Sequence, residues 1–357
     1  MLQQTQVATV VPYYLRFLSV FPSARRLAAA PLERVLTQWS GLGYYRRARH
    51  LHLAAQKILR EFGGRFPESY GQARSLPGIG DYTARAILSI AYNQPYAVLD
   101  GNVARVVSRL AEIAGGVDQS AFRDAVGAEL QGLLSRRQPG NFNQALMELG
   151  QTICLPGAPL CAICPLVRWC RAYSCESTHT YPRPRRRRAT ELRYLATAVI
   201  RRVPRANKSQ GVAEWAHADP TPSLRDMANG DPQFALVRGL DEGLLVDLWN
   251  FPAAFGSSQR EAFARLQEKL RIASSFPLRW HHDPSSDTHT PLLRLHHGIT
   301  YRSIEVDVYG ADVTTPPEAS GPIRWYSFNG LKNAAVSQLA RKIAGSLEGN
   351  TGGSWPP

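Results

Sequence analysis

The chain has 357 residues, a formal net charge of +14 and 44% hydrophobic residues. This length favours two domains over one, and the excess of basic side chains favours a polyanionic partner such as nucleic acid. No apolar run reaches the ~20 residues that cross a bilayer, and no basic stretch precedes an apolar one at the N-terminus. We therefore expect neither a membrane protein nor a signal peptide, but a cytoplasmic monomer, associated with the nucleoid in a bacterium.

Residues 1–154 contain helical patterns only. In residues 4–18 apolar side chains recur with the helical period, and Pro12 is expected to kink or split this helix. Residues 44–62 form a long amphipathic pattern whose basic face is either solvated or in contact with phosphates. The basic residues of this face are Arg46, Arg47, Arg49, His50, Lys57 and Arg60. Further helices are expected at residues 23–30, 31–39, 81–92, 101–114, 120–134 and 141–154.

A tight turn at Leu76-Pro77-Gly78-Ile79-Gly80 separates two helical patterns. Gly78 and Gly80 allow φ > 0 and the close approach of another backbone. The amides that follow lie at the start of the next helix, where unpaired N–H groups and the helix dipole favour an anion such as a DNA phosphate. Asp100 follows an apolar run and precedes a glycine, so its carboxylate can face a cleft or cap the next helix. A phosphate site and a lone carboxylate one helix apart suggest chemistry on nucleic acid.

Four of the five cysteines lie close together, at Cys154, Cys161, Cys164 and Cys170. They are too few and too clustered for a disulfide scaffold, so we expect a metal or cluster site. Structural zinc usually pairs two short spacings, and here only one spacing is short. The longer loops favour an iron–sulfur cubane, with zinc as the alternative. Cys175 lies outside the pattern.

Strand patterns dominate after a basic, proline-interrupted linker at residues 176–191. They fall at residues 194–200, 234–237, 292–295, 302–308 and 323–328, and a final helix is expected at residues 331–347. The predicted architecture is therefore multidomain: an all-α domain at residues 1–175, the linker, an α+β domain at residues 192–348 and a disordered tail at residues 349–357.

Several motifs together resemble the helix-hairpin-helix DNA glycosylases that carry a 4Fe-4S cluster, and within them the adenine DNA glycosylase (MutY) family. They are Met1-Leu2-Gln3-Gln4-Thr5-Gln6-Val7, Gly41-Leu42-Gly43-Tyr44-Tyr45-Arg46-Arg47-Ala48-Arg49, the hairpin turn, Leu99-Asp100-Gly101-Asn102-Val103, Phe142-Asn143-Gln144-Ala145-Leu146 and the cysteine group. The resemblance spans residues 1–184 and implies a 4Fe-4S cluster on the four cysteines.

The resemblance implies base excision repair. Adenine mispaired with 8-oxoguanine or guanine in duplex DNA is flipped out, and its N-glycosidic bond is hydrolysed. Asp100 resembles the carboxylate that stabilises the oxocarbenium-like sugar, and Asn102 resembles a residue that supports it. Tyr82 occupies the position where endonuclease III-like lyases carry a Schiff-base lysine, so the chain is expected to be monofunctional. An endonuclease III-like glycosylase/lyase is the disfavoured alternative.

The same resemblance implies DNA-binding roles for residues at the start of the chain and in later motifs. Leu2 and Gln144 resemble residues around the flipped adenine, and Gln3 belongs to the same DNA-binding set. Gln4 and Tyr44 resemble residues that wedge into the duplex beside the lesion. Each could instead be a polar or packing residue with no such role.

The segment Arg238–Pro252 resembles the arginine, Gly-Leu and Trp-x-Phe-Pro elements of a Nudix-like fold, which implies recognition of 8-oxoguanine. Residues 253–270 contain no Arg-Glu-x-x-Glu-Glu run, so we expect binding without Nudix hydrolysis. Thr300 retains the hydroxyl of the Phe-Ser-His loop that often touches the oxidised guanine in the family.

The family also has a glutamate two residues before the position that matches Met1, and this glutamate protonates the departing adenine. The first acidic residue of the sequence is Glu33. We expect that the start is misassigned and that a longer chain exists. The alternative is a shortened form that binds lesions but is impaired in catalysis.

Overall fold

The computed structural model describes residues 1–184, 189–202, 233–273, 278–281, 290–299, 301–313, 323–332 and 334–349. The chain divides into two compact units, one made of residues 1–49 and 188–357 and the other of residues 50–187. The domain boundaries proposed above remain predictions, and almost all of the expected tail lies outside the described residues. No helix in the described part of the chain is both long and apolar enough to cross a membrane.

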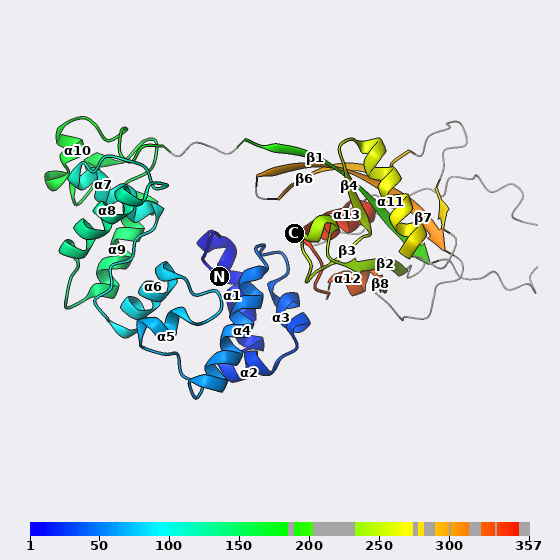
Figure 1. Ribbon diagram of the computed structural model, residues 1–357, viewed down its shortest axis with the longest axis horizontal. Coiled ribbons are helices and arrows are strands. Elements are labelled where there is room, and N and C mark those ends of the chain that lie inside the picture. Colours follow the sequence, from blue (N-terminus) through cyan, green and yellow to red (C-terminus); the bar gives the residue numbers. More distant parts are fainter. Residues whose placement is uncertain are drawn as a thin grey trace, which may run out of the picture. The chain divides into compact units, whose positions relative to one another are not determined.

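The first unit begins with three helices and the start of a fourth (Figure 1). These are α1 (Val7–Val20), α2 (Ala24–Ala29), α3 (Leu32–Trp39) and α4 (Arg46–Glu61). Pro12 lies inside α1, and the helix continues through it. The ring of Phe17 packs edge-on against Trp39 with the ring centroids 5.9 Å apart. Helices α1 and α3 are therefore held together by their aromatic residues.

The second unit is helical throughout its described elements. It contains most of α4, then α5 (Tyr70–Arg74), α6 (Asp81–Tyr92), α7 (Gly101–Ala111), α8 (Ser120–Leu133), α9 (Pro139–Thr152), η1 (Cys161–Ile163), η2 (Val167–Trp169) and α10 (Arg171–Ser174). Apolar side chains of α7, α8 and α9 form one core. Gly150 lets α9 approach α7, since a Cβ there would lie 2.8 Å from Asn102 Cβ. The all-α prediction for this part of the chain is confirmed.

A mixed sheet forms the centre of the rest of the first unit. Its strands are β1 (Glu191–Arg202), β2 (Gln233–Arg238), β3 (Trp249–Asn250), β4 (Ala253–Gly256), β5 (Arg279–Trp280), β6 (Leu293–Ile299), β7 (Arg302–Val313) and β8 (Ile323–Ser327). The long strands β1 and β7 run parallel, in register from Glu191 opposite Arg302 to Arg202 opposite Val313. The other paired strands are antiparallel.

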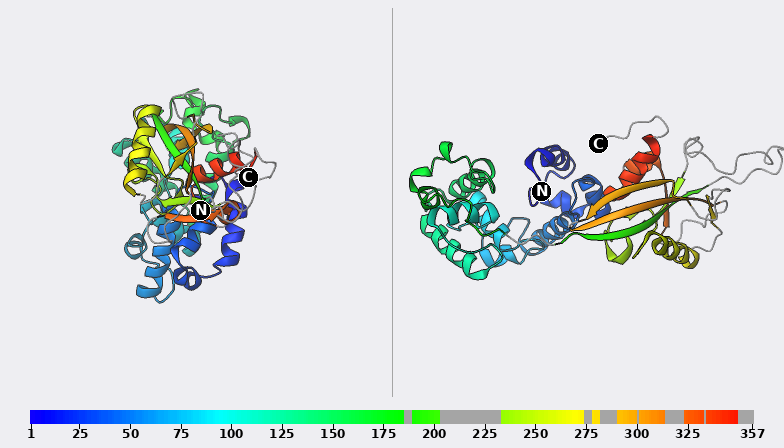
Figure 2. Two further views of the ribbon diagram at one scale, coloured as in Figure 1. Left: turned by 90° about the vertical axis from the view of Figure 1, so that its right-hand side faces the viewer. Right: turned by 90° about the horizontal axis from the view of Figure 1, so that it is seen from above.

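Helices cover both faces of this sheet. Figure 2 (left) shows α11 (Gln259–Ala273) on one face and α13 (Gln338–Gly349) on the other. Successive side chains of a strand point to opposite faces, so Leu195 and Val199 of β1 join the α13 side while Ala196 and Ala198 join the α11 side. The predicted α+β domain is confirmed, and both faces of its sheet are buried against helices.

The predicted single helix at residues 331–347 is wrong in one respect, because two helices occupy this region. Helix α12 (Phe328–Lys332) ends before α13 begins at Gln338. Between them, Ala335 O accepts a hydrogen bond from Trp249 N at 2.9 Å, and Ser337 N donates to Trp249 O at 3.1 Å. This bridge to β3 uses backbone groups that a continuous helix would have needed for itself.

Glu33 joins the N-terminal helices of the first unit to the sheet. Its Oε1 accepts a hydrogen bond from Trp249 Nε1 at 2.9 Å. The guanidinium groups of Arg238 and Arg324 lie 3.3 Å and 3.4 Å from the same carboxylate. Since Glu33 lies on α3 and these partners lie on β2, β3 and β8, distant parts of the sequence meet at one carboxylate.

Candidate functional site

Asp100 stands at the N-cap of α7. Its Oδ1 accepts a hydrogen bond from the backbone N–H of Val103 at 2.7 Å. The capping role considered from the sequence is thus present, and it also fixes the direction of the carboxylate. The positive end of the α7 dipole lies next to this carboxylate.

Tyr82 projects from α6 toward α9 and is 37% exposed. Its hydroxyl donates a hydrogen bond to Met147 Sδ at 3.5 Å. Burial raises the pKa of Tyr82, and the negative charge of Asp100 raises it further. Tyr82 therefore lies within electrostatic reach of Asp100 and remains protonated at neutral pH.

Asn102 lies in the first turn of α7, and its Oδ1 accepts a hydrogen bond from Arg105 Nη2 at 3.0 Å. Arg105 is buried and also donates to Gly150 O at 2.7 Å and to Cys154 O at 2.8 Å. Burial lowers the pKa of Arg105. One guanidinium thus ties the Asp100 end of α7 to the end of α9 and to the first cysteine.

The sequence reasoning missed Arg105 and its neighbour one turn later, Arg109. The available signal was two arginines four residues apart in a helix that is otherwise largely apolar. It also missed Asn143, which is 1% exposed and accepts a hydrogen bond from Val98 N at 3.1 Å. Asn143 thereby anchors the segment that leads into Asp100.

Gln144 is exposed on α9, and its Nε2 donates to Gly140 O in the same helix at 3.3 Å. Its predicted place in the adenine pocket therefore stays a prediction. In the hairpin, Gly78 has φ +78°, and a Cβ there would lie 2.6 Å from His50 Cβ. Glycine is required at this position both for its backbone conformation and for space. Gly80 is the N-cap of α6 with φ −86°, an ordinary extended conformation.

The remaining predicted DNA-binding residues belong to the first unit. Leu2, Gln3, Gln4 and Tyr44 are all exposed. Gln4 has φ +63° and Tyr44 has φ +48°, both in the left-handed region that non-glycine residues seldom adopt. Thr300 lies outside the described residues.

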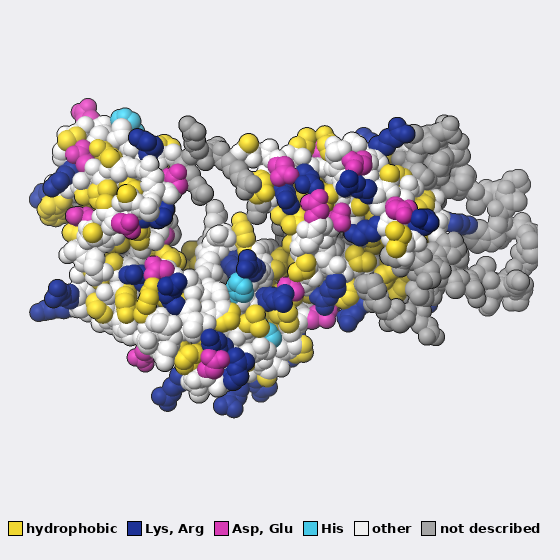
Figure 3. All heavy atoms as spheres, viewed as in Figure 1, with side chains coloured by type: hydrophobic (Ala, Val, Ile, Leu, Met, Phe, Trp, Pro, Cys, Tyr) yellow, Lys and Arg dark blue, Asp and Glu magenta, His cyan; other side chains and the backbone are white. Residues whose placement is uncertain are grey.

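Basic side chains are numerous on the surface. Arg46, Arg49 and Arg60 of α4 are exposed. Figure 3 shows Lys and Arg side chains over the helices at the bottom of the view. Arg49 pairs with Asp247, with its Nη1 2.8 Å from Oδ1, so not every basic residue of the predicted face is available to a phosphate.

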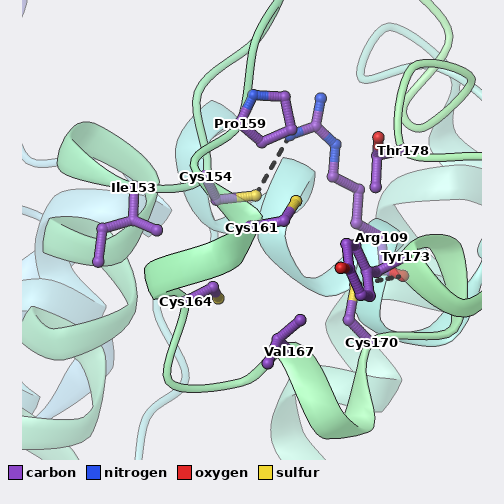
Figure 4. Close-up of a pocket in the computed structure, with 10 residues that line it drawn as sticks. All are labelled: Arg109, Ile153, Cys154, Pro159, Cys161, Cys164, Val167, Cys170, Tyr173 and Thr178. Carbon is purple, nitrogen blue, oxygen red and sulfur yellow. Dashed lines mark hydrogen bonds between the residues drawn. The ribbon is translucent and has the colours of Figure 1, made fainter. Parts of the chain in front are cut away.

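The four clustered cysteines line one pocket, together with Arg109, Ile153, Pro159, Val167, Tyr173 and Thr178 (Figure 4). The empty space among them is about 310 Å³, part of it open to solvent. Arg109 Nη1 donates to Cys154 Sγ at 3.3 Å, and Cys170 Sγ donates to Arg109 O at 3.5 Å. None of the five cysteines forms a disulfide.

The donor set of this pocket fits an iron–sulfur cluster. All four candidate ligands are thiols. Burial and then the neighbouring Cys154 and Cys164 raise the pKa of Cys161, and a positively charged group bound among these thiols would oppose that rise. Within the described residues, no group of three or more His, Cys, Asp and Glu side chains could hold one metal ion. The four thiols thus line a common space, but they are not close enough together to bind one metal ion.

Comparison with known proteins places the chain in a family. A model of the HhH-GPD superfamily base excision DNA repair proteins matches residues 1–125. The adenine DNA glycosylase of Mus musculus is 36% identical over 365 residues, which cover 96% of this chain and 69% of the mouse protein. The adenine DNA glycosylase of Homo sapiens is 33% identical over 388 residues, which cover 99% of this chain and 68% of the human protein.

Among solved structures, a thermostable thymine-DNA glycosylase is similar with a TM-score of 0.43 and 24% identity, over 49% of this chain and 80% of that one. The sequence relatives carry the assignment, because each is aligned over nearly the whole of this chain, including the sheet. The chain belongs to the adenine DNA glycosylase family of helix-hairpin-helix base excision DNA repair proteins.

Proposed function

We propose that this protein removes adenine mispaired with 8-oxoguanine or guanine in duplex DNA, by hydrolysing the N-glycosidic bond and leaving the strand intact. The observation that carries the proposal is the Asp100 carboxylate, held at the N-terminus of α7 with Tyr82 nearby. This arrangement offers a fixed negative charge and no amine nucleophile.

The chemistry of adenine removal explains why such a carboxylate is needed. The target base cannot be reached inside the stack, so it must first be flipped into a pocket. Departure of adenine then leaves positive charge on the deoxyribose, which a fixed carboxylate stabilises without reorganisation. In Asp100 the hydrogen bond from Val103 N holds the carboxylate in place.

Tyr82 supports hydrolysis rather than strand cleavage. A lyase needs an amine that attacks the sugar and forms a Schiff base. The phenol of Tyr82 has a raised pKa, through burial and the charge of Asp100, and it cannot form an imine. In this proposal water therefore attacks the sugar as adenine leaves, and the product is an abasic site.

Duplex binding in this proposal uses both units. The hairpin at Gly78 and the start of α6 would contact a phosphate, and the exposed arginines of α4 would contribute further charge. Gln4 and Tyr44 would enter the duplex beside the lesion. The sheet of the first unit and its covering helices, which we infer to be Nudix-like, would recognise 8-oxoguanine in the opposite strand.

The cysteine pocket would hold a 4Fe-4S cluster through Cys154, Cys161, Cys164 and Cys170. When bound, the cluster would cross-link the loop that carries these thiols and so order it. A Cys154→Ser variant is expected to lose iron and the brown chromophore in an anaerobic preparation, whereas Cys175→Ser should keep both. Equal iron content in the two variants would contradict the assignment.

A strand-break assay tests the proposed reaction. The protein, expressed from its own gene, is incubated with a duplex that contains one adenine opposite 8-oxoguanine, and half of each sample is then heated in alkali. We expect breaks at this adenine only in the alkali-treated half. Breaks without alkali would indicate a lyase, and breaks in neither half would overturn the proposal. A duplex with the same adenine opposite thymine serves as the control.

A further inference from the structure

Two neighbouring turns of the first unit carry exposed side chains on unusual backbone. The turn at residues 1–5 contains Gln4 with φ +63°, and the turn at residues 43–44 contains Tyr44 with φ +48°. Tyr44 is 52% exposed, and Gln4 is exposed as well. A left-handed backbone at non-glycine residues costs free energy and persists only where surrounding contacts impose it. One side chain contacts both turns.

That side chain is Arg47, in the first turn of α4. Its Nη1 donates to Met1 O at 2.5 Å and to Gln3 O, and its Nη2 donates to Thr5 Oγ1 at 3.0 Å. The same Nη2 donates to Gly43 O at 3.1 Å. One guanidinium therefore closes both turns and fixes them against each other.

The remaining donor of Arg47 is also used. Its Nε donates to Tyr44 O at 3.4 Å. A guanidinium has five N–H groups, and each of the five now has an acceptor within the protein. No N–H group of Arg47 is left to bind a phosphate unless these bonds break.

Two aromatic rings lie beside the guanidinium. Its central carbon lies 5.4 Å from the ring centroid of Trp39 and 5.4 Å from that of Tyr44. Trp39 is 1% exposed and donates from Nε1 to Gly43 O at 3.1 Å. Tyr44 is thus supported on one side by a cation that is itself anchored on a buried ring.

We propose that Arg47 is a positioning residue that presets Gln4 and Tyr44 for entry into the duplex. This role rests on the proposed function, in which Gln4 and Tyr44 enter the duplex beside the lesion. The sequence predicted that Arg47 belongs to a basic face that is solvated or binds phosphates. In the structure its guanidinium instead binds the two turns. Lysine cannot replace it, because an ammonium group has three donors and no planar fork.

Binding measurements separate this role from a phosphate contact. The ligands are two duplexes, one with 2′-fluoro-2′-deoxyadenosine, which resists hydrolysis, opposite 8-oxoguanine and one fully paired, each with 2-aminopurine beside the tested pair. We expect Arg47→Lys and Arg47→Gln to lose about 5- to 150-fold in affinity for the mispaired duplex only, the range that one stacking contact contributes. The 2-aminopurine fluorescence increase that reports unstacking should fall in parallel.

The salt dependence of binding gives the second readout. A phosphate contact would lower the slope of log K against log salt by about 0.9 in Arg47→Gln and would be rescued in Arg47→Lys. We expect an unchanged slope in both variants. The matched control is Arg25→Gln, an exposed arginine of the same unit that should keep both the preference for the mispair and the wild-type slope. A smaller slope in Arg47→Gln, or full rescue by lysine, would overturn the proposal.

A double-mutant cycle tests whether Arg47 acts through Tyr44. We expect Arg47→Gln combined with Tyr44→Ala to lose little more than Tyr44→Ala alone, whereas additive losses would contradict the proposal. If the Arg47 variants fail to fold, Thr5→Val removes a single acceptor and should still give a partial loss of preference. Wild-type protein without any preference for the mispair would refute the proposed function, whereas an intact preference in the variants would refute only the role of Arg47.

Discussion

The two roles of Asp100 can be separated by substitution, because asparagine keeps one and loses the other. As an N-cap, Asp100 accepts a hydrogen bond from Val103 N at 2.7 Å, and an asparagine carbonyl can accept the same bond. Asparagine and aspartate cap helices about equally well, whereas alanine costs ~1 kcal/mol. The free energy of unfolding of Asp100→Asn should therefore stay within about 0.5 kcal/mol of wild type.

The catalytic role predicts a large effect of the same substitution. Removing a preorganised charge that faces a developing charge typically costs about 10²–10³ in rate. We expect Asp100→Asn to lose at least this factor in single-turnover adenine removal while it still binds the mispaired duplex. Asp118→Asn, an exposed aspartate in the same unit, is the matched control and should be unaffected.

Urea denaturation and single-turnover assays on Asp100→Asn and Asp100→Ala complete this test. We expect the two variants to share the loss of activity and to differ in stability. An active Asp100→Asn enzyme would show that Asp100 is only a helix cap. An Asp100→Asn variant as unstable as Asp100→Ala would show that the cap geometry has been misunderstood.

Three further predictions follow from individual contacts. Tyr82→Lys supplies an amine near the reacting sugar and should produce strand breaks without alkali, so an alkali-dependent product from this variant would count against the position of Tyr82. Arg105→Gln removes the donor to two backbone carbonyls and should lower the unfolding free energy by roughly 2–4 kcal/mol in urea titrations, so a change below about 0.5 kcal/mol would contradict its structural role. Burial opposes ionisation of Asp312, but hydrogen bonds from His281 and Arg201 lower its pKa from 3.8 to about 2. Asp312→Asn should thus cost about 2 kcal/mol at neutral pH, and the difference from wild type should shrink as the pH falls from about 4 through 2. A difference that is as large at pH 2 as at neutral pH would refute this assignment.

Local patterns in the sequence predicted much of the helical part of the chain. The periodic apolar residues indicated α4, α6, α7 and α8, because each helix buries one stripe of side chains. The turn at Gly78 and the start of α7 at Asp100 were also predictable, since glycine and aspartate have specific roles at helix ends. The grouping of four cysteines in one pocket followed from their spacing.

Contacts between distant segments could not be predicted in this way. The break between α12 and α13 depends on Trp249, whose backbone N–H donates to one residue and whose C=O accepts from another, both more than 80 positions later in the chain. Glu33 looked like an ordinary acidic residue of a short helix, yet its main partners are Trp249 and two arginines of the sheet. No local pattern records such pairings, because they form only when the tertiary structure brings the segments together.

Arg47 illustrates the same limit within the site. On a helical projection it belongs to a basic face, and a solvated or phosphate-binding role was the reasonable expectation. The structure instead turns its guanidinium toward the turns that carry Gln4 and Tyr44. Periodicity shows on which face of a helix a side chain lies. It does not show which loop packs against that face and accepts hydrogen bonds from the side chain.

Identification of the released base shows whether the protein hydrolyses the N-glycosidic bond of adenine. The protein, expressed from its own gene, is incubated with a duplex that contains adenine opposite 8-oxoguanine, and the products are analysed by mass spectrometry without alkali. We expect free adenine together with an equal amount of intact strand that bears a hydrolysed abasic site. Absence of free adenine, or a cleaved strand with an unsaturated sugar end, would contradict this expectation.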